Sequence, residues 1–547
     1  MTHQQMARDG PSRRAAHGLG ACLLGALLAI SFAYPPVARA DTGQWSKPAA
    51  VSPDVDGWWP NVVADRAGNV HLVWRGEFPD RPLHMSALYY SRWDGGGWSK
   101  PNDIALLSVG GGGDPPPASS LAVDPNGRLH LMYRGFGPQG TDTLGQESLW
   151  HAVVDGARAG SASSWQAATQ LVRSGYARYS DIAIDSRGVA HSIWTEEDGW
   201  GCGIYYTRSA DGGATWSGRV SLDAVNLVSC SRAQLEVDGQ DRLHAVWELT
   251  DTRLKVETAG VIRGMAYATS KDGGKTWSKA RWPDTPILYP AKDSSEQRPK
   301  PGPQQPAVGV DGKGNVLLVY REPTGNQIFC LVSADGERWA PPSPVPGVKA
   351  GVARLHDAYD MATDSAGHVH LAMVAYPADS DTMSLLHAEW DGQNWAKVST
   401  VASSPPFPEY PRLAVSEGNR LHVVWLGGDG PNIDRASLGI WHSTAQTTAP
   451  AVARQIAAAP AAASATPSTT PQPTPPPVRD LGTVAEPESG PRVGTTLASH
   501  ESLGDLGREP AYPLLLGAAS VIPLLAAMLG ARLAASSIAD LRRSRRS

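Results

Sequence analysis

Guanidinium and carboxyl side chains recur at two fixed distances from a repeated anchor residue. The seven anchors are His71, His130, His191, His244, Leu317, His370 and His422. Four residues after them, or five in the sixth unit, stand Arg75, Arg134, Thr195, Glu248, Arg321, Ala375 and Leu426, and ten residues before them stand Asn61, Ser120, Asp181, Gln234, Ala307, Asp360 and Arg412. Guanidinium groups bind carboxylates through paired hydrogen bonds, and carboxyl groups can transfer protons. These two positions are therefore the candidates for chemistry.

The residues around each anchor predict a tight β-hairpin. In "NVVADRAGNVHLVW" and its six relatives, an apolar run leads to a turn and then to a second apolar run. The turn has Asp at positions 65, 124, 185, 238, 311 and 364 and usually Gly, at 68, 127, 188, 314 and 367. Gly supplies a positive φ, and an Asp side chain can accept from turn amides. The six repeated histidines lie in separate units, so we expect structural hydrogen bonds from them and no metal site.

A second motif joins the third and fourth strands expected in each unit. "SADGGATW" and "SKDGGKTW" are complete copies, and "SADGERW", "WDGGGW" and "WDGQNW" are shorter forms. Its structural residues are Ser209, Asp211, Gly213, Trp216, Ser270, Asp272, Gly274, Trp277, Asp335 and Trp339. We expect Ser and Asp to bond turn amides, Gly to allow the reversal, and Trp to pack against the blade.

With this motif, the Asp-box, residues 41–445 resemble the sialidase-like Asp-box (BNR) repeat β-propellers. The resemblance implies an all-β fold, and seven hairpins imply seven blades. The text "GQWSKPAAVS" near Trp45 matches the fourth strands of later units, and the last unit lacks its own. The N-terminal strand should therefore close the seventh blade, which leaves no open sheet edge. Familiar sialidases have six blades, so the blade count departs from that family.

Any ligand site is expected at the loops between strands 2 and 3 and between strands 4 and 1, which share one face of a propeller. The turns and Asp-boxes share the other face. Varied loops on a rigid scaffold are where binding residues gather. The candidates are Arg75, Arg134, Arg321, Arg412, Glu248, Glu322, Asp181 and Asp360, with Trp58, Trp59, Tyr179, Tyr359 and Tyr410 to stack on sugar rings.

Two functions are compatible with this pattern, and a third class stays open. The favoured hypothesis is a module that binds a glycan or a protein. The alternative, implied by the resemblance, is an exo-α-sialidase, which holds an anionic sugar with three arginines and uses a Tyr nucleophile, a Glu and an Asp. Arg75, Arg134, Arg321 and Arg412 are possible counterparts, but the family's Arg-Ile-Pro signature is replaced by "GWWPNVVAD". No catalytic residue is therefore assigned. Another hydrolase or lyase is the third class.

The two ends of the chain predict export and membrane anchoring. Residues 1–40 have a basic start, an apolar stretch and an Ala-Arg-Ala cleavage site, which is typical of a signal peptide. Residues 446–510 are rich in Ala, Pro, Thr and Ser and predict a linker. Residues 511–534 predict a transmembrane helix, and the basic tail at 535–547 favours a cytoplasmic C-terminus. The propeller should then be displayed on the cell surface.

Composition excludes some classes of function. The formal net charge is −5, which argues against nucleic acid as a partner. Four Cys in 547 residues are too few for a disulfide scaffold. Cys202 and Cys230 are candidates to pair, and Cys330 is expected to be buried. No metal or cofactor motif occurs, so none is predicted.

Overall fold

The computed structural model describes residues 44–53, 55–77, 85–109, 119–135, 148–165, 168–172, 177–197, 201–226, 228–251, 261–281, 304–322, 326–351, 358–430 and 436–455. The predicted signal peptide, most of the linker, the predicted helix at 511–534 and the tail lie outside these residues. Among the residues described, no helix is long and apolar enough to cross a membrane. The side chains of Cys202 and Cys230 are also outside the description. Cys330 is buried and has a free thiol, as expected.

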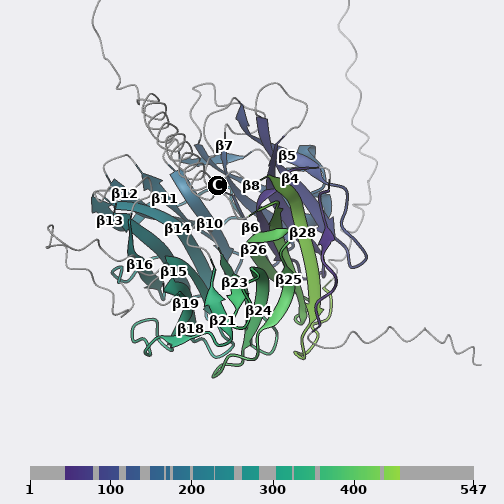
Figure 1. The fold of residues 1–547 in the computed structure, drawn as a ribbon. Helices are drawn as coiled ribbons and strands as arrows, with labels where there is room; N and C mark the ends of the chain where they lie inside the picture. The colour runs from purple at the N-terminus through teal and green to yellow at the C-terminus, as the bar shows by residue number, and fades with distance from the viewer. Residues whose placement is uncertain are drawn as a thin grey trace, which may run out of the picture. The chain divides into compact units, whose positions relative to one another are not determined.

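The strands form seven antiparallel sheets, each of which is one blade (Figure 1). Blade 1 contains β2 (Trp58–Ala64), β3 (Val70–Glu77), β4 (Met85–Trp93) and β5 (Asn102–Val109). Blade 2 contains β6 (Ser120–Val123), β7 (Arg128–Gly135), β8 (Ser148–Asp155) and β9 (Thr169–Val172). Blade 3 contains β10 (Ala177–Ile184), β11 (Ala190–Glu197), β12 (Gly201–Ser209) and β13 (Val220–Asn226). Blade 4 contains β14 (Val228–Val237), β15 (Leu243–Asp251) and β16 (Val261–Ser270). Two short 3-10 helices, Gly156–Arg158 and Ala162–Ser164, follow β8.

Blades 5 to 7 complete the set. Blade 5 contains β17 (Gln304–Val310), β18 (Val316–Glu322), β19 (Gln327–Ser333) and β20 (Ser343–Pro344). Blade 6 contains β21 (Val348–Ala350), β22 (Tyr359–Thr363), β23 (Val369–Pro377), β24 (Ser384–Trp390) and β25 (Ser399–Ser403). Blade 7 contains β26 (Phe407–Ser416), β27 (Arg420–Gly428), β28 (Ser437–Gln446) and β1 (Ala49–Ala50). The innermost strands β2, β6, β10, β14, β17, β22 and β26 each contact the next, and β26 contacts β2. This closed ring confirms the predicted seven-bladed β-propeller.

The N-terminal strand closes blade 7, as the sequence predicts. In β1, Ala49 pairs with His442 and Ala50 with Trp441 of β28. The Trp45 ring also lies 5.3 Å from the His387 ring of blade 6. Trp216, Trp277 and Trp339 of the Asp-boxes make the same edge-on contact with a ring of the preceding blade. Trp45 therefore serves as the Asp-box tryptophan of blade 7.

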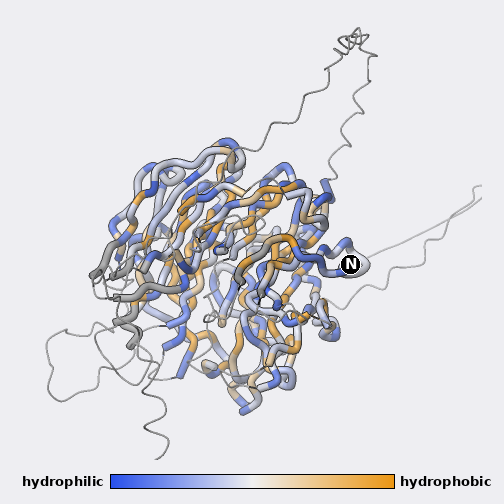
Figure 2. The backbone as a smooth tube through the Cα atoms, turned by 90° about the horizontal axis from the view of Figure 1, so that it is seen from above, coloured by the Kyte–Doolittle hydropathy of each residue, from blue (hydrophilic) through white to orange (hydrophobic). Residues whose placement is uncertain are grey.

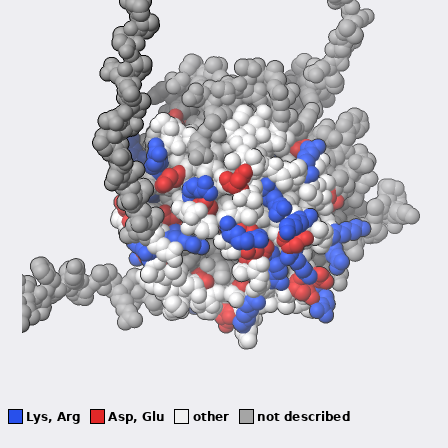
Figure 3. Space-filling view, turned by 180° about the vertical axis from the view of Figure 1, so that it is seen from behind, with Lys and Arg blue, Asp and Glu red and all other residues white. Residues whose placement is uncertain are grey.

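The core lies between the blades, where apolar strand segments face one another (Figure 2). Aromatic residues within the second strands are fully buried, and two of them, Trp74 and Trp194, stack on Tyr89 and Tyr205 of the third strands at 5.9 Å. Polar turns enclose this core. On the face shown in Figure 3, basic and acidic side chains are interspersed.

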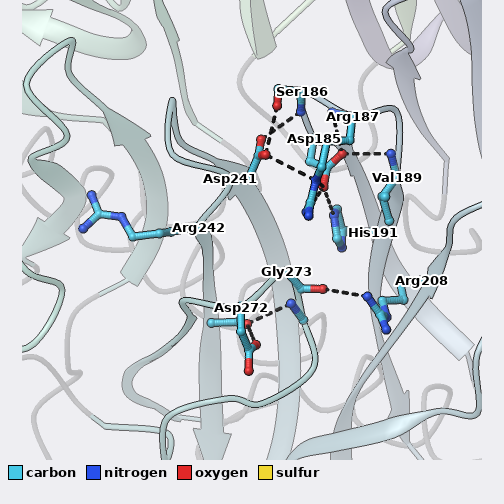
Figure 4. Close-up of polar contacts among 12 residues, drawn as sticks. Asp185, Ser186, Arg187, Val189, His191, Arg208, Asp241, Arg242, Asp272 and Gly273 are labelled. Atoms are coloured by element: carbon cyan, nitrogen blue, oxygen red, sulfur yellow. Dashed lines mark hydrogen bonds and ion pairs between the residues drawn. The ribbon is translucent and has the colours of Figure 1, made fainter.

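The hairpin turns and Asp-boxes share one face, as predicted, and they join neighbouring blades there. In the first complete Asp-box, Asp211 accepts from the Thr215 amide at 2.9 Å, and Ser209 accepts from the Gly213 amide at 2.8 Å. Between blades 3 and 4, Arg208 donates to the Gly273 carbonyl at 3.3 Å, and Ser186 donates to Asp241 (Figure 4).

The repeated histidines are structural, as expected. In blade 1, the His71 ring lies 2.7 Å from the Tyr90 hydroxyl and 3.2 Å from the turn carboxylate of Asp65. Blades 3 and 4 have the same Asp–His–Tyr arrangement. In blades 2, 6 and 7 a second histidine replaces the tyrosine, as in the pair His130 and His151 at 3.1 Å. Each imidazole thus holds its turn to the neighbouring strand.

The chain continues in contact with the turn face after β28. The amides of Thr447, Val452 and Gln455 donate to the carbonyls of Asn419, Glu417 and Arg66. Residues 447–455, which we call the strap, therefore cross from blade 7 to blade 1. Ala449 of the strap is buried. The contacts with the propeller extend ten residues beyond the predicted boundary at 445.

Candidate functional site

Five innermost strands break their pairing register at the same point. The breaks follow Trp58, Arg178, Ser231, Gln304 and Glu409. The next residues are Trp59, Tyr179, Arg232, Gln305 and Tyr410, with φ values of 50°, 39°, 52°, 56° and 50°. A left-handed backbone conformation destabilises a residue other than Gly by on the order of 1–3 kcal/mol. Residues in this conformation are concentrated at functional sites. Such bulges redirect side chains.

A pocket of about 300 Å³ lies on the axis beside these bulges. All seven innermost strands contribute to its wall. The polar and aromatic residues that line it are Trp59, Asn61, Ser119, Ser120, Tyr179, Ser180, Asp181, Arg232, Gln234, Glu236, Asp360 and Arg412. The lining runs from the bulges to residues near the hairpin turns, such as Val63 and Glu236, and the bulged end of the pocket adjoins the strand 4–1 connections. This is the end where the sequence places a ligand site.

In several units, the polar residue ten positions before the anchor also forms a hydrogen bond with the next blade. The amide of Leu235 in blade 4 donates to Asp181 of blade 3 at 2.8 Å. The amide of Leu413 in blade 7 donates to Asp360 of blade 6 at 2.7 Å. Asn61 donates to the Ser119 carbonyl at 3.0 Å in the same manner. These side chains line the pocket as predicted, and they fix its wall as well.

Two carboxyl groups of the pocket hold protons unusually tightly. Burial raises the pKa of Asp181 to about 7, although two backbone amides and Arg412 favour its charged form. Burial, together with the charges of Asp181 and Asp360, raises the pKa of Glu236 to about 8. Glu236 is half-buried by surface area, but it lines the pocket, so that area lies inside the molecule. Both groups therefore exchange protons near neutral pH.

A buried ion pair supports one side of the pocket. Arg232 donates to Glu248 at 2.6 Å, and their side chains are 3% and 1% exposed. Glu248 also accepts from the Gln305 amide. Sequence reasoning selected Glu248 but missed Arg232 and Glu236. Both lie at fixed distances from the His244 anchor, so the repeat alignment contained the signal.

The predicted arginines do not converge. Among the pocket's lining residues, Arg412 is the single one of the four predicted arginines. Arg321 donates to the Gly351 carbonyl, Gln304 and Asn326, and so holds its own loop. Arg75 lies over the Trp59 ring, 5.4 Å from its centroid. Arg134 is half-buried at the end of β7. The geometry is not that of an arginine triad.

The remaining candidates lie around the pocket but do not line it. Trp58 and Tyr410 pack with Trp59 and Leu426 in a small apolar cluster. Glu322 is half-buried at the end of β18. Tyr359 is 1% exposed, and its hydroxyl has no hydrogen-bond partner in the part of the chain described. These side chains shape the wall from behind, and Trp59, Tyr179, Asp181, Asp360 and Arg412 are the predicted residues in contact with the pocket.

Comparison with known families agrees with the fold. The family model of the BNR repeat-like domain matches residues 189–423. The resemblance to sialidase-like Asp-box propellers is therefore confirmed. No curated protein is similar to the chain in sequence.

Solved structures similar to this BNR repeat propeller include proteins of different activities. A protein of unknown function from Dyadobacter fermentans is 15% identical over 74% of this chain and 99% of its own, with a TM-score of 0.42. An ulvan lyase of polysaccharide lyase family PL25 is 14% identical over 72% and 95%, with a TM-score of 0.46. The NanB sialidase of Streptococcus pneumoniae is 12% identical over 75% and 70%, with a TM-score of 0.39. Identities this low do not transfer an activity.

Proposed function

We propose that this protein is an exported, membrane-anchored propeller that binds carbohydrate in its axial pocket. The observation that carries the proposal is the pocket of about 300 Å³, with two aromatic rings and several ionisable groups in its wall. This volume is at the small end of ligand pockets, which suits one sugar unit. Aromatic faces stack on sugar rings, and dense polar groups suit hydroxyls.

Binding to a glycan array, followed by calorimetry with the full-length chain, tests this proposal. Tyr179 lines the pocket and is half-buried, so Tyr179→Ala should weaken binding at least about tenfold, or roughly 1.4 kcal/mol. Tyr376 of β23 is also half-buried and does not line the pocket, so Tyr376→Ala is the matched control. Failure to bind any glycan, or equal binding by Tyr179→Ala, would refute carbohydrate binding at this site and leave a protein ligand as the alternative.

Hydrolysis of an α-sialoside is the second candidate function. The raised pKa values of Asp181 and Glu236 favour it, because a general acid must be protonated near neutral pH. The scattered arginines weigh against it. A fluorogenic α-sialoside measures the activity directly. Turnover by the wild type that is lost in Asp181→Asn would establish catalysis, whereas absence of turnover would reject the sialidase hypothesis.

Display on the cell surface is the part of the proposal that rests on sequence alone. It is supported by the apolar segment at 511–534 and the arginines that follow it. Intact cells treated with protease should lose the propeller, while the basic tail stays protected. Recovery of the protein in a soluble fraction would contradict the anchor.

A further inference from the structure

The charges that line the axial pocket are unbalanced. Arg232 is matched by Glu248, with which it forms a buried pair. Among the other lining residues, the carboxyl groups of Asp181, Asp360 and Glu236 stand against the guanidinium of Arg412. Their mutual repulsion contributes to the raised pKa of Glu236. A ligand that brings positive charge would relieve this repulsion.

Glu236 is singular in its position. The residue eight before the anchor is Val63, Ala122, Ala183, Gly309, Ala362 or Ala414 in the other six units. At this level of the ring, Glu236 is the single ionisable side chain among small apolar ones, and it lines the pocket. No hydrogen bond joins its carboxyl group to another residue in the part of the chain described. A buried carboxylate without a partner is costly, so its partner should come from a ligand.

The excess of acidic groups in the pocket wall favours a positively charged organic ligand. Within the residues described, no three His, Cys, Asp or Glu side chains are placed to hold a metal ion. An ammonium group can donate to a single carboxylate, and other acidic groups in the same wall favour its positive charge without contacting it. Trp59 and Tyr179 also present ring faces, which attract cations as well as sugar rings. A carboxylate-bearing sugar would instead meet the three acidic groups.

We infer that the sugar bound in the axial pocket is an amino sugar with a free, protonated amine, held by Glu236, with the charges of Asp181 and Asp360 nearby favouring the cation. This inference rests on the proposed carbohydrate binding. It names a ligand class opposite in charge to the anionic sugars that the sialidase resemblance implies.

Calorimetry with the full-length chain tests the inference. The probes are a glucosamine trimer, an N-acetylglucosamine trimer and a glucuronate-containing trisaccharide, at equal ionic strength near neutral pH. The glucosamine trimer should bind at least about tenfold more tightly than either of the others. Glu236→Gln should abolish this preference, and Glu337→Gln, on the exposed turn face, should leave it unchanged.

The outcomes separate the inference from the function on which it rests. Equal or tighter binding of the acetylated or acidic trimer would overturn the amine assignment and keep carbohydrate binding. If none of the three trimers binds and the glycan array shows no binding, both the amine assignment and the proposed carbohydrate binding are refuted. A preference that survives in Glu236→Gln would remove Glu236 from the site. Thermal unfolding of Glu236→Gln at the assay pH distinguishes lost recognition from lost folding.

Discussion

The position of Glu236 on the axis lets its carboxyl group line the pocket and raises the pKa of that group. Its neighbours at the same level are small, so the carboxyl group has room to face the pocket, and its depth raises its pKa. Burial in the pocket places the Glu236 carboxyl group where it can contact a ligand, and it also makes ionisation of that group destabilise the folded state. The stability of the protein should therefore report its protonation.

Replacing Glu236 by Gln should stabilise the protein in alkaline solution and not in acid. The pKa of Glu236 is raised to about 8 by burial and by Asp181, Asp360 and Asp238, so the folded state holds a proton that the unfolded chain releases. Folding stability therefore falls as the pH rises from about 4.5 to about 8. The melting temperature of Glu236→Gln should exceed that of the wild type at about pH 9 and match it at about pH 5. A gain that is equal at both pH values would contradict this account.

At the residue scale, sequence predicts the pocket only in part. The alignment places Asp181, Asp360 and Arg412 correctly, because an innermost strand has one side facing the axis. It could not tell that Arg75 lies over Trp59 or that Arg321 binds its own loop, since those contacts depend on side-chain rotamers. Arg232 stands at a fixed distance from its anchor, but the alignment does not show the bulge that brings it to Glu248.

At the element scale, the Asp-box glycines serve neighbouring blades as well as their own turns. Gly274 of blade 4 has φ +78°, and a Cβ there would lie 1.7 Å from the Tyr206 hydroxyl of blade 3. Gly213 and Gly336 face His151 and Tyr267 in the same way. The motif therefore selects Gly for two reasons, a left-handed backbone and the close approach of a ring.

Gly274→Ala should destabilise the protein by about 2–4 kcal/mol, the sum of left-handed strain and overpacking. Gly218 has no atom within 4 Å of a built Cβ and no positive φ, so Gly218→Ala should change stability by less than about 0.5 kcal/mol. Chemical denaturation of both variants measures the difference. Similar midpoints for the two would disprove the role assigned to the Tyr206 contact.

Sequence predicts the elements better than the site, because hairpin and Asp-box signals are local. The blade count and the closing strand follow from seven anchors and the text around Trp45. The exceptions lie where pairing is irregular. Blade 4 has three strands and a single bridge between Tyr267 and Arg281, and two strands, β21 and β22, pair with β23 in blade 6. The text of these blades gave no sign of either feature.

At the scale of the whole molecule, the histidine pairs set the limit of acid stability. Burial lowers the pKa of His151, and likewise of His387 and His442, to about 3 from an ordinary value of 6.5. Because the unfolded chain takes up protons that the folded state refuses, stability is complete above about pH 6.5 and falls as the pH approaches 3.

Exchanging His and Tyr at the paired position should shift this acid limit in both directions. His151→Tyr copies the arrangement of blades 1, 3 and 4, so its melting temperature should exceed that of the wild type at about pH 5 and differ little at about pH 7.5. Tyr206→His should lower it at about pH 5. Scanning calorimetry at both pH values provides the comparison, and equal acid sensitivity in all three proteins would exclude the histidine pairs as the cause.

The strap should contribute to the stability of the ring. A chain that ends at Gln446 loses the backbone hydrogen bonds to Asn419, Glu417 and Arg66, whereas one that ends at Gln455 retains them. With a net contribution of about 1 kcal/mol for each bond, the shorter chain should be less stable by about 3 kcal/mol. Equal melting temperatures would show that these bonds do not stabilise closure.

The strap also fixes where mechanical load enters the ring. The chain leaves the propeller beside Arg66 on the turn face, whereas the bulged end of the pocket lies at the other end of the inner strands. Tension on the C-terminal segment would act first on the hydrogen bonds through which the strap connects blade 7 to blade 1. The ring is closed at the same place, because β1 pairs with β28 of blade 7. A ligand in the pocket would contact the inner strands of all seven blades, whereas tension on the C-terminal segment would enter the ring where blade 7 meets blade 1.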